Sequence, residues 1–307
     1  MTNAHTAGEL KEGTFRAEAL PGTIQTGVLT YIGDSISLSP NSDHKAGYIT
    51  LPGNRTFGAV QRGPYELGCT YKYYSRAAGA WGDWRDFIAK YALGAVDNPT
   101  DHLSTFTFIC YVISSGKWEV YPGCKINKAV ISGDNPGNFL QFEAQIFSMA
   151  ALIEPSKTIT DYQGITIGAD PTFPTEALLY WDANQQMNLN GGGLLNHYPK
   201  KWSLTIDNHL DRLPAVQTWY DGTKYPAAIE LHEDIREIIY ECEMLLKDAT
   251  WDIAKHNHYP VTALTLPIGN KVITLSDGDL VPNNFRDLSQ KLGSDNLKIM
   301  FPTLSIA

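Results

Sequence analysis

Apolar and polar positions alternate along most of this chain, which is the pattern of β-strands with one buried face. Segment 64–74 is the clearest case, because every second residue from Tyr65 to Tyr73 is aromatic, aliphatic or cysteine. Segment 105–113 is apolar on both faces, as is typical of a strand buried on both sides. These patterns predict a mainly β protein.

A hairpin is predicted where segments 125–131 and 139–147 flank SGDNPGN (132–138), because these linking residues favour turns. In the second segment Phe142 and Ala144 lie on the opposite side from Glu143, so one face of the hairpin should be wetter than the other. The strands are therefore expected to pair antiparallel.

Helical spacing is limited to short stretches. DWRDFIAKYAL (83–93) carries one apolar stripe between a possible cap at Asp83 and a possible stop at Gly94, which predicts a helix. TWDIAKH (250–256) is a shorter version of the same pattern. Segment 232–248 fits both an amphipathic helix and an alternating strand, and periodicity alone leaves this open. Its counterpart at 64–74 favours the strand.

The two halves of the chain resemble each other. Three pairs of segments match in kind and order: 84–90 with 250–255, 105–113 with 261–269, and 138–150 with 296–307. The last pair ends at residues 150 and 307, which are 157 positions apart, or half the chain. This spacing indicates a tandem duplication.

The expected organisation is two tandem antiparallel β-sandwich or partial-barrel domains, each with one flanking α-helix. The first covers residues 1–155 and includes an N-terminal arm before Pro21. A Pro-, Gly- and Thr-rich linker occupies 156–174, and the second domain covers 175–307.

Composition and charge limit the classes of molecule that the chain is expected to bind. The chain of 307 residues has 24 Lys and Arg against 33 Asp and Glu, a net charge of −9, which disfavours tight binding to nucleic acid phosphates. We expect no secretory signal, no membrane span and synthesis in the cytoplasm of a host cell. The four cysteines are spaced unlike a zinc site or a disulfide framework, so buried free thiols are expected. No cofactor is expected.

Ser35 is the one candidate nucleophile, since YIGDSISLS (31–39) resembles the Gly-Asp-Ser segment of GDSL-type esterases. That family places an Asp-x-x-His pair near its C-terminus, whereas the nearest pairs here are Asp207 with His209 and Asp252 with His256. Their spacings are one residue too short and one too long. The expectation is therefore no enzyme, no catalytic residue and no metal site, because His256 and His258 also lack neighbouring ligands.

Two stretches resemble segments of a known protein family. GCKINKAVISGDNPGNFLQFEAQIFSMAA (123–151) resembles the C-terminal hairpin of phage tail tube proteins. KKWSLTIDNHLDRLPAV (200–216), followed by GTKYPAAIELHEDIREIIYECEMLL (222–246), resembles a second pair of segments recurring in these proteins. The acidic HEDIRE (232–237) departs from the more Gly-rich turn that is usual there.

The resemblance implies a structural role. Tail tube proteins form six-membered rings whose inner sheets close into one barrel, and the rings stack into a conduit for genome passage. Where one chain carries two such domains, three copies make a pseudo-hexameric ring. The expected location is the virion tail. Expected partners are copies of the chain and the tail terminator, tape measure and baseplate proteins, while DNA passes through the lumen without specific binding.

Two candidate surfaces are implied by this resemblance. Glu237, Glu241 and Glu243 could form an acidic strand facing the lumen, because negative charge repels phosphate. The glycine-rich segment with Gly191, Gly192, Gly193 and His197 could be a loop between rings, as could the N-terminal arm. A distal-tail or baseplate ring protein of the same fold, the esterase and a sugar-binding β-sandwich remain alternatives.

Overall fold

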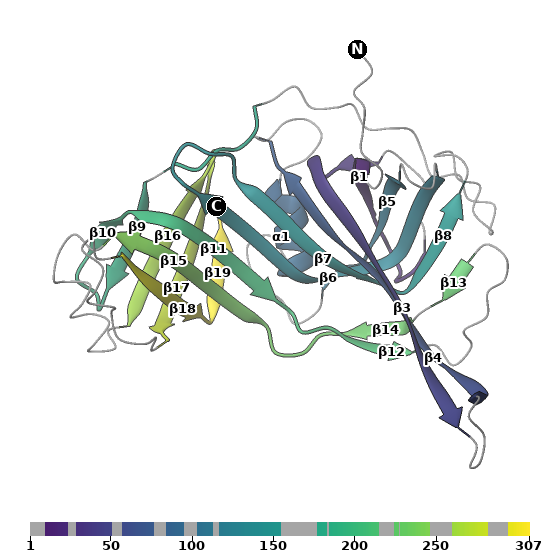
Figure 1. The fold of residues 1–307 in the computed structure, drawn as a ribbon. Coiled ribbons are helices and arrows are strands. Elements are labelled where there is room, and N and C mark those ends of the chain that lie inside the picture. Colours follow the sequence, from purple (N-terminus) through teal and green to yellow (C-terminus); the bar gives the residue numbers. More distant parts are fainter. Residues whose placement is uncertain are drawn as a thin grey trace.

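The protein is mainly β, with one short helix, in the residues that the structure describes (Figure 1). The computed structural model describes residues 10–23, 29–50, 57–76, 84–94, 103–112, 117–154, 177–182, 184–214, 224–226, 228–245, 260–281 and 294–307. The elements are β1 (Leu10–Ala17), β2 (Thr30–Tyr31), β3 (Asp34–Thr50), β4 (Phe57–Tyr74), α1 (Trp84–Ala92), β5 (Phe106–Val112), β6 (Lys117–Asp134), β7 (Gln141–Ser148), β8 (Ala150–Glu154), β9 (Gln185–Leu189), β10 (Leu194–His197), β11 (Pro199–Asp207), β12 (Asp211–Pro214), β13 (Lys224–Pro226), β14 (Ala228–His232), β15 (Glu237–Leu245), β16 (Val261–Ile268), β17 (Lys271–Leu280), β18 (Ser294–Phe301) and β19 (Thr303–Ile306).

One sheet crosses the whole molecule. Its antiparallel order is β3–β4–β7–β6–β11–β15–β18–β17, and we call it the large sheet. The middle pairing, β6 with β11, joins the first half of the chain to the second. Among the described strands β3 pairs only with β4, so one end of the large sheet presents an edge that is not hydrogen-bonded to another strand.

Each half also has a smaller sheet. The order is β2–β1–β5–β6–β8 in the first half and β10–β9–β16–β17–β19 in the second, and β13 of the second half pairs with β8. The aromatic rings of Tyr71 on β4 and Phe108 on β5 lie 5.6 Å apart, so the two sheets of the first half face each other across a common core. The arrangement is sandwich-like because apolar side chains alternate inward from both sheets.

Helix α1 closes the core of the first half. Its apolar stripe is buried, with Phe87 packed on Phe15 of β1 and Trp84 packed on Phe142 of β7. The helix confirms the prediction made from segment 83–93. Segment 250–256, expected to be the second helix, lies outside the described residues, as does the linker 156–174.

The pairing order of the first half recurs in the second. The series β2–β1–β5–β6–β8 has its counterpart in β10–β9–β16–β17–β19, and β3–β4–β7–β6 in β11–β15–β18–β17. In each half one strand, β6 or β17, belongs to both sheets. Each of these strands has a residue with positive φ where it changes sheets, Gly123 at 66° and Asp277 at 56°. The left-handed backbone there bends the strand from one sheet into the other.

The ambiguous segment is resolved as extended chain. β14 ends at His232 and β15 begins at Glu237, so the strand interpretation of 232–248 holds for its described part. Ile238, Tyr240 and Cys242 face the core, as alternation requires.

Two expectations need correction. The segment before Pro21 is not wholly an arm, because β1 (Leu10–Ala17) pairs with β5 inside the first half. The spacing of 157 positions was also wrong: Phe147 opposite Lys125 corresponds to Met300 opposite Asp279, which is a spacing of 153. The spacing of 157 came from similar residues in segments 138–150 and 296–307. Strand register depends instead on which residues point toward the core.

Candidate functional site

The two halves meet along seven opposed residue pairs of β6 and β11, from Lys128 opposite Asp207 to Asp134 opposite Lys201. Trp202 of β11 lies directly opposite Gly133 of β6. A Cβ added at Gly133 would lie 2.7 Å from the Trp202 indole nitrogen, so glycine provides the space for this ring. The junction is thus a packed strand pair rather than a loose contact between separate bodies.

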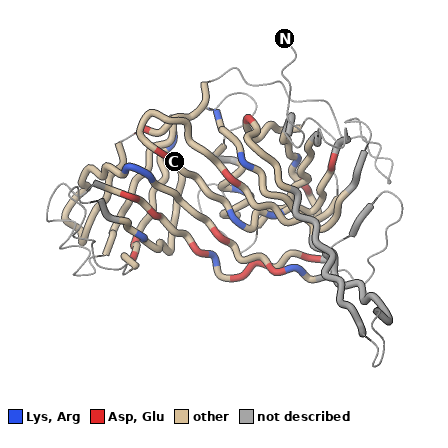
Figure 2. Tube along the Cα trace, viewed as in Figure 1, with Lys and Arg blue, Asp and Glu red and all other residues tan. Residues whose placement is uncertain are grey.

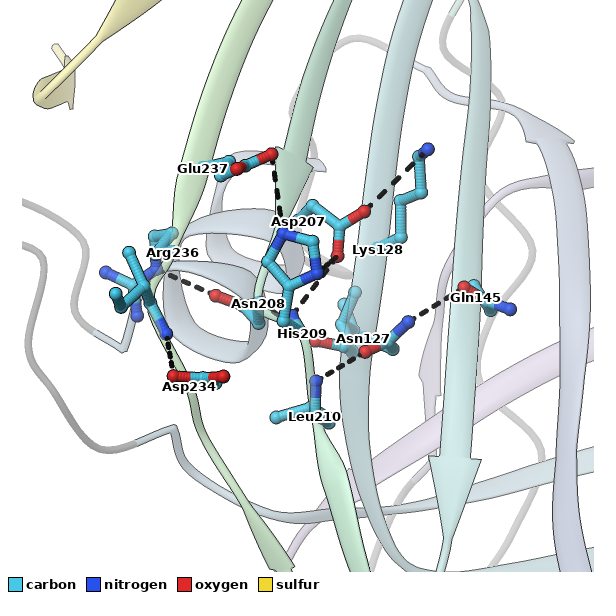
Figure 3. A network of polar contacts seen from close by, with 12 residues as sticks. Asn127, Lys128, Gln145, Asp207, Asn208, His209, Leu210, Asp234, Arg236 and Glu237 are labelled. Carbon is cyan, nitrogen blue, oxygen red and sulfur yellow. Dashed lines mark hydrogen bonds and ion pairs between the residues drawn. The ribbon is translucent and has the colours of Figure 1, made fainter.

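Asn208, which follows the last paired residue of β11, forms hydrogen bonds that hold this end of the junction together (Figure 3). Its buried side-chain amide donates to the carbonyl of Ile126 (2.9 Å) and to that of Ala92 at the end of α1 (3.1 Å). Its side-chain oxygen accepts from Nε of Arg236 (2.7 Å). One amide therefore connects β6, the helix and the start of β15.

Asn127 makes the matching contacts from the other side. Its side-chain oxygen accepts from the N–H of Leu210 (2.7 Å), and its amide donates to Gln145 on β7 (2.9 Å). The N–H of Asn208 donates to the backbone carbonyl of Asn127 (2.7 Å). The buried Asn208 and the half-buried Asn127 make these bonds in only one register of the two strands.

A largely buried ion pair lies beside these amides. Lys125 Nζ is 2.6 Å from Glu233 Oε1, and the two side chains are only 12% and 13% exposed. Lys125 also donates to the carbonyl of Leu231, and Glu233 accepts from the N–H of Leu103. Burial by itself raises the pKa of Glu233, but the hydrogen bonds from Lys125 and Leu103 and the Lys125 charge outweigh it and lower the pKa.

The hairpin β12–β14 reaches from the second half onto the first. Arg212 places its guanidinium 3.8 Å from the centre of the Phe147 ring and donates to the carbonyl of Leu67 (3.0 Å). Both Phe147 and Leu67 belong to the first half. The hairpin therefore adds a cation–π contact to the junction.

The large sheet has a polar face opposite the core. Cross-strand neighbours on this face carry opposite charges, as in Lys72 with Glu143 (2.9 Å) and Lys298 with Glu241 (3.4 Å). Figure 2 shows positions of both signs among these strands. The described charged residues of the face include Lys72, Lys128, Lys201, Lys298, Asp134, Glu143, Asp207, Glu237, Glu241, Glu243 and Asp279. Charges of both signs make the described part of this face hydrophilic.

The predicted acidic strand lies on this face, since Glu237, Glu241 and Glu243 all point away from the core side of β15. They are not isolated charges. Glu237 is 3.4 Å from the His209 ring, Glu241 is 3.4 Å from Lys298, and Glu243 is 3.4 Å from Lys200. Because these pairs are partly exposed, each contributes little to stability, about 0–1 kcal/mol.

The glycine-rich segment is a tight turn and then a strand. Gly191 and Gly193 have positive φ values of 72° and 93° in the exposed turn between β9 and β10. His197 corrects the expected loop, because it lies in β10 and is fully buried. Its side chain packs inside the second half and cannot contact a neighbouring molecule.

His197 belongs to a buried polar cluster. Its Nε2 lies 3.1 Å from the Tyr240 hydroxyl. The side-chain amide of Gln185 donates to the same hydroxyl, and its oxygen accepts from the indole N–H groups of Trp181 and Trp202. Burial lowers the pKa of His197 from 6.5 to about 4, so the ring is neutral in the folded protein at neutral pH.

This burial predicts an acid-sensitive core. The free energy of unfolding does not depend on His197 above about pH 6.5. Below that value it falls by about 1.4 kcal/mol per pH unit until the pH reaches about 4, because His197 binds a proton more tightly in the unfolded chain than in the folded protein. Between pH 7.5 and 5.5, wild type should therefore lose about 1 kcal/mol of unfolding free energy more than His197→Gln. Denaturant melts at both pH values measure this, with the exposed His232→Gln as control. Parallel losses in all three proteins would contradict the prediction.

The esterase alternative gains no support from the geometry. Ser35 lies within β3, and its buried Oγ has no hydrogen-bond partner among the described residues. Two depressions of about 470 and 400 Å³ lie on the polar face of the large sheet, and Ser35 lines neither. In the described part of the chain, no group of three His, Cys, Asp or Glu side chains could hold a metal ion. The four cysteines are free and buried, as expected.

The junction residues were not singled out from the sequence, although the two family-like segments contain them. Lys125 and Asn127 lie in GCKIN, and Asn208 ends SLTIDN. Glu233 lies in HEDIRE, where the sequence departs from the family pattern. This acidic segment was the available sign of the ion pair, because a carboxylate that is buried on folding requires a cation such as Lys125 beside it.

No protein-family model and no curated protein matches this chain. None of the helices in the described residues is long and apolar enough to cross a membrane.

Proposed function

We propose that this protein is a structural subunit of a viral tail tube, and that three copies form a ring of six similar domains around a lumen. One observation carries the proposal. The large sheet continues from one half of the chain to the other through β6 and β11, and the two halves share one pairing order. A sheet that joins halves in this way can join copies in the same way.

The edge of β3 supports this proposal, because β3 pairs with β4 alone among the strands that the structure describes. An exposed strand edge invites pairing with another chain, and closing a barrel removes it. Each copy contributes the eight strands of the large sheet to the wall of the barrel, with the polar face directed inward. Its internally paired carboxylates would let DNA pass without gripping it.

The same role implies the partners. Stacked rings would bring in further copies of the chain, and the ends of the tube would contact the tape measure, terminator and baseplate proteins of the virion. The distal-tail or baseplate alternative shares the ring and differs in stacking. The protein would be made and assembled in the host cytoplasm.

Electron microscopy of the concentrated, purified protein tests the proposal. We expect hollow rings or tubes whose rings have threefold or pseudo-sixfold symmetry. Single rings that never stack would indicate a terminal ring protein. Particles that stay monomeric at every concentration would refute the tail tube role.

A further inference from the structure

We propose that one ring stacks on the next through opposite ends of the large sheet, with Ile235 of one copy entering a depression beside Phe139 of another. The inference rests on the proposed function, because the contact joins two rings. It names the two surfaces that meet and the residues that each contributes.

The receiving surface is the depression of about 470 Å³ at the β6–β7 turn, which we call the end depression. Tyr74 and Phe139 line it, with their ring centres 5.9 Å apart. Phe139 is 52% exposed, and Tyr180, which forms a β-bridge with it, is 60% exposed. Gly137 lines the same depression without a side chain to fill it. An apolar side chain that entered here would cover aromatic surface that faces water in the single copy.

The projecting surface is the short link between β14 and β15. Ile235 is 78% exposed, the largest fraction for any large apolar side chain in the described residues. Its N–H donates to the Asp234 carboxylate (2.8 Å), and the N–H of Asp234 donates to the carbonyl of Asn208 (3.3 Å). Figure 3 shows Asp234 and Arg236, the two neighbours of Ile235, grouped with Asn208. Because hydrogen bonds already hold this link, Ile235 loses little conformational freedom when it is covered.

The two surfaces lie at opposite ends of β11. Lys201, which lines the end depression, is near the start of this strand and lies opposite Asp134. Glu237, two residues after Ile235, lies opposite Asp207 at the end of the strand. Six residues of strand separate Lys201 from Asp207, a distance of about 20 Å. A copy displaced along this strand direction therefore brings its Ile235 toward the end depression of its neighbour.

This geometry favours another copy as the occupant. The surfaces that meet are different, so the contact is heterologous and repeats from copy to copy as a stack. A protein that binds only one end of the molecule would use only one of the two surfaces.

Charge complementarity favours the same occupant. Lys201 is exposed at the end depression and forms no ion pair with a described side chain. Asp234, beside Ile235, is also exposed and has the opposite charge. The contact brings this carboxylate to the side of the depression where Lys201 lies. The acid already there, Asp134, accepts a hydrogen bond from the Asn135 side chain (3.3 Å).

Cysteine cross-linking tests the contact directly. Ile235→Cys with Asn138→Cys places one thiol on each surface, since Asn138 is exposed and lines the end depression. The native cysteines in the structure are buried. The two new thiols of one chain are too far apart for a disulfide, so oxidation of the assembled double variant should give a ladder of cross-linked chains. Val272→Cys with Asn138→Cys is the matched control and should give no ladder, because Val272, 38% exposed, lies on β17 outside both surfaces.

Serine substitutions test the energy of the contact. Ile235→Ser and Phe139→Ser should each raise the concentration needed for stacking at least about tenfold and leave single rings intact, because each removes apolar surface from the centre of the contact. Val272→Ser, at an exposed apolar residue elsewhere, should stack like wild type. Electron microscopy separates rings from stacks, sedimentation velocity gives the concentrations, and circular dichroism melts check folding.

The outcomes separate this inference from the proposed function. Tubes that form normally in the folded serine variants, or a ladder as strong in the control pair as in the test pair, would overturn the contact and leave the tube role intact. Wild-type rings that never stack would overturn it and indicate a terminal ring protein. A wild-type protein that stays monomeric at every concentration would refute the proposed function, and this inference with it.

Discussion

Glu233→Ala should lower the free energy of unfolding by about 2–3 kcal/mol, because it leaves the largely buried Lys125 ammonium without its counter-charge. It also removes the acceptor of the Leu103 N–H. Urea unfolding at pH 7 measures the change. Glu230→Ala, at a carboxylate that is 57% exposed on the neighbouring strand, is the matched control and should change stability by less than about 0.5 kcal/mol.

The companion variant Lys125→Met with Glu233→Leu separates charge from packing. Replacing both partners by apolar side chains should recover most of the lost stability, since neither charge is left buried. Equal stability of Glu233→Ala and Glu230→Ala would show that the pair contributes nothing. The Glu233 pKa is lowered on folding, so its contribution is complete above the unfolded value of 4.5 and is lost as the pH falls below it.

Asn208→Ala should lower the free energy of unfolding by about 3 kcal/mol, because two buried carbonyls lose a hydrogen-bond donor and the part-buried Arg236 loses one of its partners. The two carbonyls are those of Ala92 and Ile126. The last turn of α1 should also exchange its amide hydrogens faster, since its terminal carbonyl is no longer held.

Urea unfolding and hydrogen exchange measure the two effects. Asn184→Ala, at an exposed position before β9, is the control and should leave both unchanged. Loss of stability without faster exchange in α1 would contradict the proposed link between the helix and the junction.

Alternation was sufficient to predict most strands, because each buried face repeats every second residue. β4, β5, β7 and β16 lie where the alternating or apolar runs placed them. The helix at 84–92 was equally local, since its stripe and its terminating Gly94 are contiguous in sequence.

The junction could not be predicted, because its register is a property of strands far apart in the chain. Asn127 and Asn208 are 81 positions apart, and neither segment carries a sequence pattern that predicts the hydrogen bond between them. The same holds for Lys125 with Glu233, whose hydrogen bond spans 108 positions. The family resemblance marked both segments without pairing them.

His197 was predicted to lie in an exposed loop, but it is buried. Three consecutive glycines are typical of a loop, yet Tyr240, which Gln185 holds by a hydrogen bond, supplies a partner that makes burial of the His197 ring possible. Those partners come from β9 and β15, and β15 is distant from His197 in the sequence.

The proposed tail tube role depends on whether the large sheet continues from copy to copy. A cryo-electron microscopy reconstruction of the assembled protein tests this most directly. We predict a closed barrel in which the free edge of β3 is hydrogen-bonded to a strand of the neighbouring copy. An assembly in which β3 keeps a bare edge, or contacts only its own chain, would contradict that role.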